Sequence, residues 1–271
     1  MGHDKNYKLG IIAGSGDLPM RLAEDFANKG GEVVVAMLDG YATHDFHVFP
    51  NQKFKLGEIA RGLDFFKSHG VTNLVMAGAV TRPNFLNLKV DKLAARLVAK
   101  IVKAKIMGDD RLLRIVAGFF EAQGFKIISP MSVFSGQATI DEDVVTLLKP
   151  SLQDYADIKI GAIDAKELGK RDIGQSVIVC DGKIIDREDK NGTDALINRA
   201  ATSGAILVKM MKPMQDDRLD IPTIGEETIR KLAENGFKGV AVEANKVIIV
   251  NLEATIKLAD EMGIFIVGYR I

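Results

Sequence analysis

The feature that most constrains the fold is an alternation of short apolar runs with helical patterns over the first 130 residues. The runs at 8–13, 32–37, 73–78 and 125–128 are rich in Val, Ile and Leu, as expected for strands buried on both faces. Helical periodicity lies between them, and strand–helix–strand units close onto a parallel sheet through right-handed crossovers. Residues 1–130 are therefore predicted to form a Rossmann-like domain of the α/β class.

The rest of the chain has a different pattern. Residues 131–154 contain Pro150 and no clear periodicity, and are predicted to be a linker. From 155 onward helices mix with a strong hairpin signal, in which Asp181-Gly182 separates two apolar runs. Thr223 and Glu226 have capping-box spacing for a helix over 223–235. Residues 155–271 are predicted to form a mixed α+β domain.

Composition excludes several classes of protein. Thirty-six basic and 36 acidic side chains give zero net charge in 271 residues, which argues against a nucleic-acid partner. The one cysteine, Cys180, cannot form an intramolecular disulfide. Together with a polar N-terminus that lacks a signal-peptide pattern, it predicts a reducing, cytoplasmic setting. No apolar run reaches the ~18 residues of a membrane span.

Gly14-Ser15-Gly16 follows the first predicted strand and precedes a helical pattern that begins near Pro19. Backbone N–H groups at such a turn favour a phosphate. The segment resembles a dinucleotide fingerprint, but Pro19 stands where the third glycine belongs. Asp39, after the second strand, is a candidate partner for a ribose hydroxyl. The alternatives are nucleotide contact, including an NAD(P)-dependent oxidoreductase, and a plain tight turn.

A basic amphipathic helix is predicted over 89–107. Lys89, Lys92, Arg96, Lys100 and Lys103 share one face of it, opposite an apolar face. Such a helix either lies on an anionic membrane surface or presents an ordinary solvated face.

Asp109 and Asp110 join this stretch to the next helix, with Arg114 one turn further on. They are either helix caps or ligands for a metal or ribose hydroxyls, with Arg114 facing a phosphate.

The densest polar group follows Gly192-Thr193-Asp194 in the second half of the chain. Lysine, arginine and aspartate residues crowd the stretch from Lys209 to Asp220. Carboxylates beside cations suit a site for phosphate and a divalent cation such as Mg²⁺, with an aspartate that orients or deprotonates water. The alternative is a charged surface loop. Neither the four histidines nor Cys180 shows a metal-ligand or nucleophile pattern.

Several segments, in this order along nearly the whole chain, resemble one family. They are 9–19 (LGIIAGSGDLP), 77–83 (AGAVTRP), 108–114 (GDDRLLR), 172–176 (DIGQS), 192–195 (GTDA), 208–209 (VK), 212–213 (KP) and 215–225 (QDDRLDIPTIG). The chain is similar to the LpxI-type UDP-2,3-diacylglucosamine pyrophosphatases of lipid A biosynthesis.

The resemblance implies a Mg²⁺-dependent (or Mn²⁺-dependent) hydrolase of Gram-negative bacteria. Such enzymes cleave the pyrophosphate of UDP-2,3-diacylglucosamine to UMP and 2,3-diacylglucosamine 1-phosphate (lipid X), with water directed at the β-phosphorus. Two domains that enclose the substrate are expected. The lipid substrate makes the cytoplasmic face of the anionic inner membrane an expected partner of a peripheral enzyme. A homodimer is left open.

The resemblance also implies roles for individual residues. Asp220 is the candidate catalytic aspartate, and Asp194 and Asp220 are the candidate metal ligands. The expected substrate-binding residues are Gly14, Gly16, Arg82, Asp109, Asp110, Gln175, Thr193, Lys209, Lys212, Gln215, Arg218 and Thr223.

One position departs from the family pattern, in which a glutamate precedes Gly-Thr-Asp. Asn191 stands there, so Glu188 or Asp189 would have to replace that carboxylate if the metal needs it. Besides the oxidoreductase, a non-catalytic protein that binds nucleotide-sugar lipids is the remaining rival.

Overall fold

The fold was analysed in a computed structural model that describes residues 7–81, 88–104, 109–134 and 138–271. The chain divides into two compact units. Residues 1–134 form the first unit together with 216–220, and residues 135–215 and 221–271 form the second. The chain thus returns to the first unit for five residues in the middle of the second.

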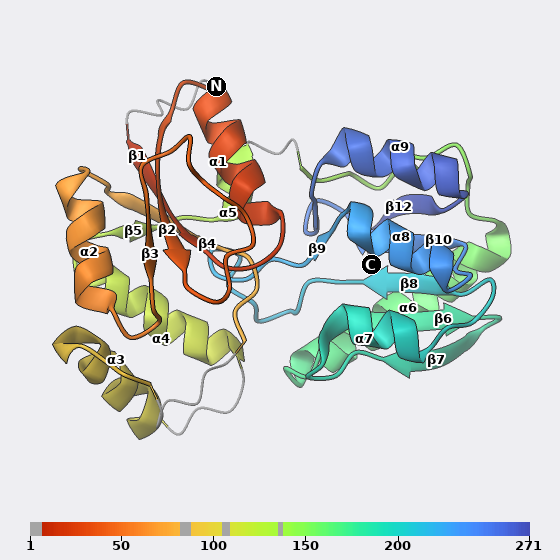
Figure 1. Cartoon of the computed structure of the whole chain (residues 1–271). Helices are drawn as coiled ribbons and strands as arrows, with labels where there is room; N and C mark the ends of the chain where they lie inside the picture. Colours follow the sequence, from red (N-terminus) through yellow and green to blue (C-terminus); the bar gives the residue numbers. More distant parts are fainter. Residues whose placement is uncertain (1–6, 82–87, 105–108, 135–137) are drawn as a thin grey trace. The chain divides into compact units, whose positions relative to one another are not determined.

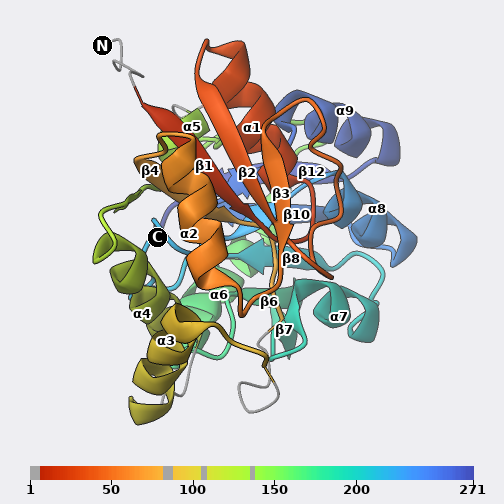
Figure 2. The same ribbon diagram turned by 60° about the vertical axis from the view of Figure 1, so that its left-hand side comes forward.

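The first unit contains a five-stranded parallel sheet in the order β3-β2-β1-β4-β5 (Figures 1 and 2). Helices α1 and α5 pack on one face, and α2, α3 and α4 cover the other. The strands are β1 (Lys8–Ala13), β2 (Glu32–Leu38), β3 (Asn51–Phe54), β4 (Asn73–Ala77) and β5 (Lys126–Ile127). The helices are α1 (Leu18–Asn28), α2 (Ile59–Ser68), α3 (Lys92–Lys103), α4 (Asp109–Glu121) and α5 (Pro130–Phe134).

The predicted α/β class and the Rossmann-like parallel sheet of this unit are confirmed. Because helices cover both faces, the central strands β1, β2 and β4 are apolar along most of their length. The sequence pattern predicted these three strands and β5. The edge strand β3 has the sequence Asn-Gln-Lys-Phe and was not predicted. Only Phe54 of this strand is buried, so it carries no apolar run.

The second unit holds a mixed five-stranded sheet in the order β12-β10-β8-β6-β7 (Figure 1). β8, β10 and β12 are parallel, and β6 is antiparallel to both of its neighbours. Helix α6 covers one face, and α7, α8 and α9 cover the other. The strands are β6 (Ser176–Cys180), β7 (Lys183–Arg187), β8 (Ile206–Lys209), β10 (Gly239–Glu243) and β12 (Phe265–Tyr269). The helices are α6 (Leu152–Lys170), α7 (Gly192–Arg199), α8 (Glu226–Glu234) and α9 (Leu252–Met262). A separate parallel pair joins β9 (Thr223–Ile224) to β11 (Ile248–Ile249).

The predicted hairpin is present as β6 and β7. Asp181 and Gly182 both have positive φ, 49° and 75°, as a two-residue turn of this hand requires. The predicted helix over 223–235 is shorter, because it begins at Glu226 after Gly225. Thr223 lies in β9 and is paired with Ile248, so the expected capping box at Thr223 is wrong.

The units also differ from the expected division at 1–130, 131–154 and 155–271. Parts of the expected linker are packed: Val133 and Phe134 of α5 are buried in the first unit, and Ile140 is buried in the second. The backbone N–H of Asn245 donates to the Ile140 carbonyl at 2.8 Å. The segment contributes side chains to both cores although its sequence has no helical or strand periodicity.

The start of α3 depends on one carboxylate. Asp91 caps the helix, because its Oδ1 accepts hydrogen bonds from the backbone N–H groups of Leu93 (2.9 Å) and Ala94 (2.8 Å). Its Oδ2 accepts the N–H of Ala60 in the first turn of α2, at 2.7 Å. One side chain therefore satisfies N–H groups of two helices.

We expect Asp91→Ala to lower the free energy of unfolding by about 1–2 kcal/mol, since it removes a cap and leaves helix-terminal donors unpaired. Urea unfolding monitored by circular dichroism measures the change. Asp64→Ala, at an exposed position of α2, is the control and should be nearly neutral. An Asp91→Ala protein as stable as the control would contradict this role.

Candidate functional site

The glycine-rich loop after β1 packs tightly against the loop after β4. Gly14 donates its N–H to the Ala77 carbonyl (2.8 Å), and Ser15 and Ala79 exchange backbone hydrogen bonds at 3.0 Å. A Cβ built on Gly14 would lie 2.6 Å from the Ala79 carbonyl oxygen, so a side chain there would collide with backbone. Gly14 is needed for this approach of the two loops.

Gly16 has a different role. Its φ is +87°, a conformation that favours glycine, and its N–H donates to Thr43 Oγ1 at 3.1 Å. The N–H groups of Gly14, Ser15 and Gly16 thus all have partners within the protein. In a dinucleotide-binding loop the N–H groups at this turn and at the start of the helix face the pyrophosphate. The loop therefore does not support the oxidoreductase alternative.

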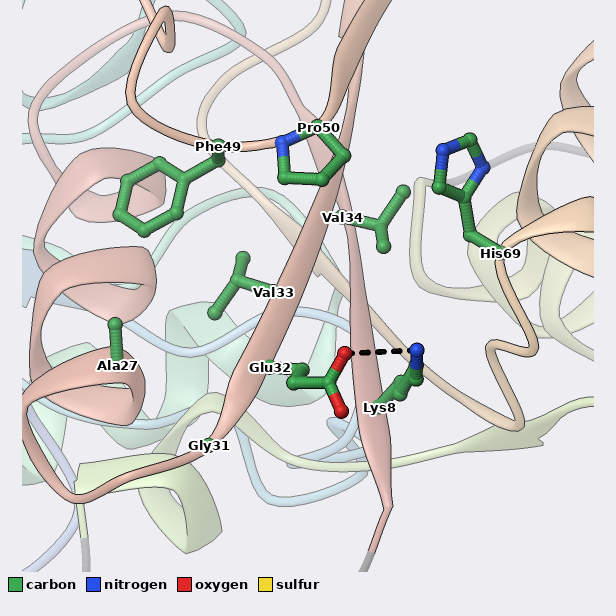
Figure 3. A pocket seen from close by; sticks show the side chains of 9 residues that line it. All are labelled: Lys8, Ala27, Gly31, Glu32, Val33, Val34, Phe49, Pro50 and His69. Carbon is green, nitrogen blue, oxygen red and sulfur yellow. Dashed lines mark ion pairs between the residues drawn. The ribbon is translucent and has the colours of Figure 1, made fainter.

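A hollow lined by described residues of the first unit lies elsewhere. It has a volume of about 200 Å³ and lies at the amino ends of β1 and β2, where Lys8 and Glu32 form an ion pair (Figure 3). Ligands of open parallel sheets bind at the carboxyl ends of the strands. The hollow is therefore not a candidate for the phosphate site.

The segment Asp216–Asp220 is held in the first unit by a cluster of charges on α4. Arg218 donates two hydrogen bonds to the Asp216 carboxylate, from Nε at 3.0 Å and from Nη2 at 2.8 Å, and a third to Glu121 Oε1 at 2.9 Å. The backbone N–H of Asp216 donates to Asp110 Oδ1 at 3.3 Å, and Arg114 Nε donates to Asp110 Oδ2 at 2.9 Å.

Apolar burial and one further hydrogen bond complete this anchor. Leu219 is buried in the core that α2, α3 and α4 share with the sheet. Ser129 Oγ donates to the Asp217 carbonyl at 2.8 Å. Asp220, half-buried, ends the segment, and its backbone N–H donates to the Asp216 carbonyl at 3.3 Å. The segment before the candidate catalytic aspartate is thus held by contacts of all four preceding residues.

In the second unit a chain of hydrogen bonds runs along the carboxyl end of β8. Lys209 Nζ donates to Thr193 Oγ1 at 3.0 Å, and Thr193 Oγ1 donates to Glu188 Oε1 at 2.8 Å. The other oxygen of Glu188 accepts the N–H of Gln175 at 2.8 Å. Lys209 and Glu188 are both buried, so the hydroxyl of Thr193 bridges a buried cation and a buried carboxylate.

Two further features lie beside this chain. The side-chain oxygen of Gln175 is buried and accepts no hydrogen bond from a described residue. Lys212 Nζ donates to Asp172 Oδ1 at 2.7 Å, and the N–H of Lys212 donates to Gln215 Oε1 at 3.1 Å. The second unit thus brings together Gln175, Thr193, Lys209, Lys212 and Gln215 of the predicted set.

Other predicted residues lie apart from this group. Asp194 is mostly exposed and pairs with Lys231 of α8 at 2.5 Å, and Lys231 also contacts Glu227 at 2.7 Å. These two carboxylates raise the pKa of Lys231, against a burial effect that lowers it. Arg82 and the side chain of Asp109 lie outside the described residues.

Glu188 was predicted only as a substitute carboxylate, and its place is now clear. It is buried beside Gly174, where a Cβ would lie 2.8 Å from the Cβ of Glu188. Asp189, the other substitute, is an ion-pair partner of Arg199 at 3.3 Å. Ser176, whose hydroxyl lies 3.2 Å from Thr193 Oγ1, was not singled out from the sequence, because a lone serine at a strand start carries no pattern.

Within the described part of the chain, no three His, Cys, Asp or Glu side chains are grouped so that they could hold a metal ion. Mg²⁺ takes one or two carboxylates together with substrate oxygens and water. Asp194 and Asp220 supply hard oxygen donors of the right chemistry. No helix among the described residues is long and apolar enough to cross a membrane.

Both units are α/β layers, and in the second unit buried polar side chains gather at the carboxyl ends of the parallel strands, the place where enzymes of this class bind ligands. Two domain models match this chain: the LpxI N-terminal domain over residues 8–137 and the LpxI C-terminal domain over 141–267. The chain belongs to the LpxI family.

A curated relative agrees with this assignment. The UDP-2,3-diacylglucosamine pyrophosphatase LpxI of Caulobacter vibrioides is 34% identical over 272 residues, which cover 96% of this chain and 97% of the relative.

Solved structures resemble the chain only distantly. A putative oxidoreductase from Escherichia coli K-12 is 17% identical over 59% of this chain and 70% of its own, with a TM-score of 0.23. A short-chain dehydrogenase/reductase variant of Serratia marcescens is 16% identical over 62% and 74%, with a TM-score of 0.24. Similarity at this level supports no conclusion about function.

We expect Thr193→Val to lower the free energy of unfolding by about 1–3 kcal/mol, since Lys209 and Glu188 would each lose a buried hydrogen bond. Thr193→Ser keeps the hydroxyl and is the matched control. Urea unfolding of both variants measures the difference. Equal stability of the two variants would show that the bridge contributes nothing.

The Asp216–Arg218 pair predicts a dependence of stability on pH. The hydrogen bonds from Arg218 hold the pKa of the Asp216 carboxyl below its usual range, and the same contact raises the pKa of Arg218. A carboxyl whose pKa is lowered by folding contributes stability above its unfolded-state pKa of about 4, and this contribution is lost as the pH falls through the lower, folded-state value.

Arg218→Gln should therefore be less stable than the wild type at pH 7, and the difference should shrink as the pH falls from about 4 towards 2. Urea titrations across this range test the expectation. A wild-type advantage that is the same at every pH would exclude the pair as its source.

Proposed function

We propose that this protein is a hydrolase that cleaves the pyrophosphate of UDP-2,3-diacylglucosamine to UMP and 2,3-diacylglucosamine 1-phosphate, a step of lipid A biosynthesis. The relative that matches nearly the whole chain is named for this substrate. The observation in the structure that supports the proposal best is the buried Lys209–Thr193–Glu188 chain at the carboxyl end of β8.

The Lys209–Thr193–Glu188 hydrogen bonds suit a pyrophosphate site because they hold a cation in a fixed place. Lys209 is a buried ammonium whose position is set by the Thr193 hydroxyl, so it can stabilise developing phosphoryl charge with little reorganisation. Lys212 adds a second cation close by in the chain, and the buried acceptor on Gln175 can take a hydroxyl or amide donor from the substrate.

Asp220 is proposed as the catalytic carboxylate. A carboxylate fixed at the end of an anchored segment can orient a water molecule, or take its proton, while the water attacks the β-phosphorus. Asp220 of the first unit and Asp194 of the second are the carboxylates proposed as metal ligands. Mg²⁺ or Mn²⁺, when bound, would supply charge neutralisation for the phosphate oxygens. Arg218 and Asp110 are already engaged with carboxylate, guanidinium or backbone partners, so their contribution is to hold the segment.

A cytoplasmic enzyme with a diacyl substrate must reach a membrane surface, and the anionic inner membrane is the proposed partner. Helix α3 supports this proposal. Its buried face is Ala94, Leu97 and Ile101, and the cations Lys92, Arg96, Lys100 and Lys103 are exposed. None of these four cations forms an ion pair with a described carboxylate. The cationic face of α3 is therefore available to anionic lipid headgroups.

The test is product analysis with detergent-dispersed UDP-2,3-diacylglucosamine in ¹⁸O-labelled water. We expect cleavage that requires Mg²⁺ or Mn²⁺ and stops with EDTA, with the label in the lipid phosphate. Asp220→Asn should lower kcat by about 10²–10⁴-fold with unchanged unfolding, as expected when a general base or water-orienting group is lost. Asp217→Asn, an exposed aspartate of the same segment, is the matched control.

Each result decides a separate point. Label in UMP would keep the reaction and move the attack to the α-phosphorus. Near-normal turnover of Asp220→Asn would remove Asp220 from the mechanism. Tight binding without turnover under every divalent cation would leave a non-catalytic binding protein.

A further inference from the structure

The second unit exposes an unusual concentration of apolar side chains along the start of α6 and the loop before it. We call this set the α6 apolar surface. Leu152 is 91% exposed, Leu147 is 83% exposed and Ile163 is 50% exposed. The complete set is Leu147, Leu148, Leu152, Tyr155, Ile160 and Ile163. Contiguous exposed apolar side chains of this kind mark a surface that binds a protein or a membrane.

Packing of α6 within its own unit does not explain this surface. The opposite face of the helix, with Ile158, Ala162, Ala165 and Leu168, is buried against the sheet. A helix that covers a sheet normally presents polar residues to solvent. Over its first three turns α6 exposes Leu152, Tyr155 and Ile160 alongside Gln153 and Lys159. Its last turn carries the usual exposed pair, Glu167 and Lys170 at 2.5 Å.

The exposed leucines are fixed in place. The N–H of Leu147 donates to Asp260 Oδ1 at 2.7 Å, and the Leu148 carbonyl accepts the Thr146 hydroxyl at 3.0 Å. Ser151 and Asp154 form a capping box that sets the start of α6. The backbone that carries these side chains is therefore held by hydrogen bonds, so little backbone entropy is lost when the side chains are buried in a partner.

We propose that the α6 apolar surface inserts into the interfacial layer of an anionic lipid bilayer. The proposal rests on the proposed function, because a diacyl substrate resides in a bilayer. Leucines that enter the acyl boundary, a tyrosine at headgroup level and flanking lysines are the composition of an interfacial surface. Lys149 and Lys159 are exposed beside the leucines, and neither forms an ion pair with a described residue.

The position of Lys159 favours lipid over a second copy of the chain. Lys159 lies one helical turn from Tyr155 and one from Ile163, in the middle of the stripe. In a symmetric dimer built on this stripe, residues near the twofold axis face their own copies. Two unpaired Lys159 ammonium groups would then repel each other, whereas anionic headgroups attract them.

The first experiment is co-sedimentation of the full chain with vesicles of phosphatidylcholine and phosphatidylglycerol at a ratio of about 7:3. We expect Leu147→Gln with Leu152→Gln to weaken vesicle binding on the order of 100-fold, from the apolar area that two leucines lose. The control is Val48→Gln with Ile271→Gln, two apolar side chains elsewhere that are 67% and 64% exposed and should leave binding unchanged.

The second experiment uses the absence of tryptophan from the chain. Leu152→Trp introduces a single fluorophore, whose emission should shift to the blue on vesicles and be quenched by brominated acyl chains. Val48→Trp should show neither effect. A Leu152→Trp protein that binds vesicles while its emission stays that of a solvated indole would overturn the insertion.

These readouts separate this proposal from the proposed function. Vesicle binding needs no nucleotide sugar, and the leucine variants should hydrolyse detergent-dispersed substrate normally. Charge reversal on α3, Lys92→Glu with Lys100→Glu, should weaken binding most at low salt, whereas the loss from the leucine variants should persist at high salt. Equal vesicle binding by wild type and leucine variants would refute the proposal. If the wild type is a dimer and the leucine variants are monomers, the surface is a contact with a second copy of the chain instead.

Discussion

The position of the candidate catalytic residue Asp220 depends on the anchoring of Asp216–Asp220 by Arg218. Arg218 uses Nε and both terminal nitrogens, two bonds to Asp216 and one to Glu121, which is 97 residues away in sequence. The other contacts described for this charged five-residue segment are the burial of Leu219 and two backbone hydrogen bonds, from Ser129 to Asp217 and from Asp216 to Asp110. A guanidinium with two carboxylate partners makes this segment a defined element, and Asp220 stands at its end.

Some of the other motifs stabilise the fold, and others are placed to bind a ligand. The glycines after β1 resemble a phosphate-binding loop in sequence. In the structure Gly14 allows the loop after β4 to pack closely against it, and Gly16 adopts a positive φ. The polar group of the second unit behaves differently. There Lys209 is buried, Glu188 is buried, and Thr193 bridges them, which is a costly arrangement for a surface loop and a useful one for holding a cation in place.

Two surfaces of the protein suit a lipid environment for different physical reasons. On α3 the exposed side chains are cations without described ion-pair partners, and on α6 they are leucines and isoleucines held in solvent by capped backbone. The first acts through charge and is weakened by salt, and the second acts through apolar burial and is not. Since the sequence pattern showed only the charged helix, the apolar surface had to be found from exposure.

The sequence alone determined the fold class, the central strands of the first sheet, the β6–β7 hairpin and the family. Each of these can be recognised from local periodicity or from an ordered set of short segments, because neither depends on contacts between residues far apart in sequence. Only the tertiary structure decided that Asp216–Asp220 belongs with the first unit, that Val133, Phe134 and Ile140 of the expected linker are core residues, and that β3 is a strand at all. Those outcomes depend on pairings such as Arg218 with Glu121, or on an edge strand whose side chains are mostly polar, and no local pattern records them. The same holds for the bridge from Lys209 to Glu188. The sequence singled out Lys209, Thr193 and Glu188 separately, but they become hydrogen-bonded to one another only when β8, α7 and the loop before it are brought together.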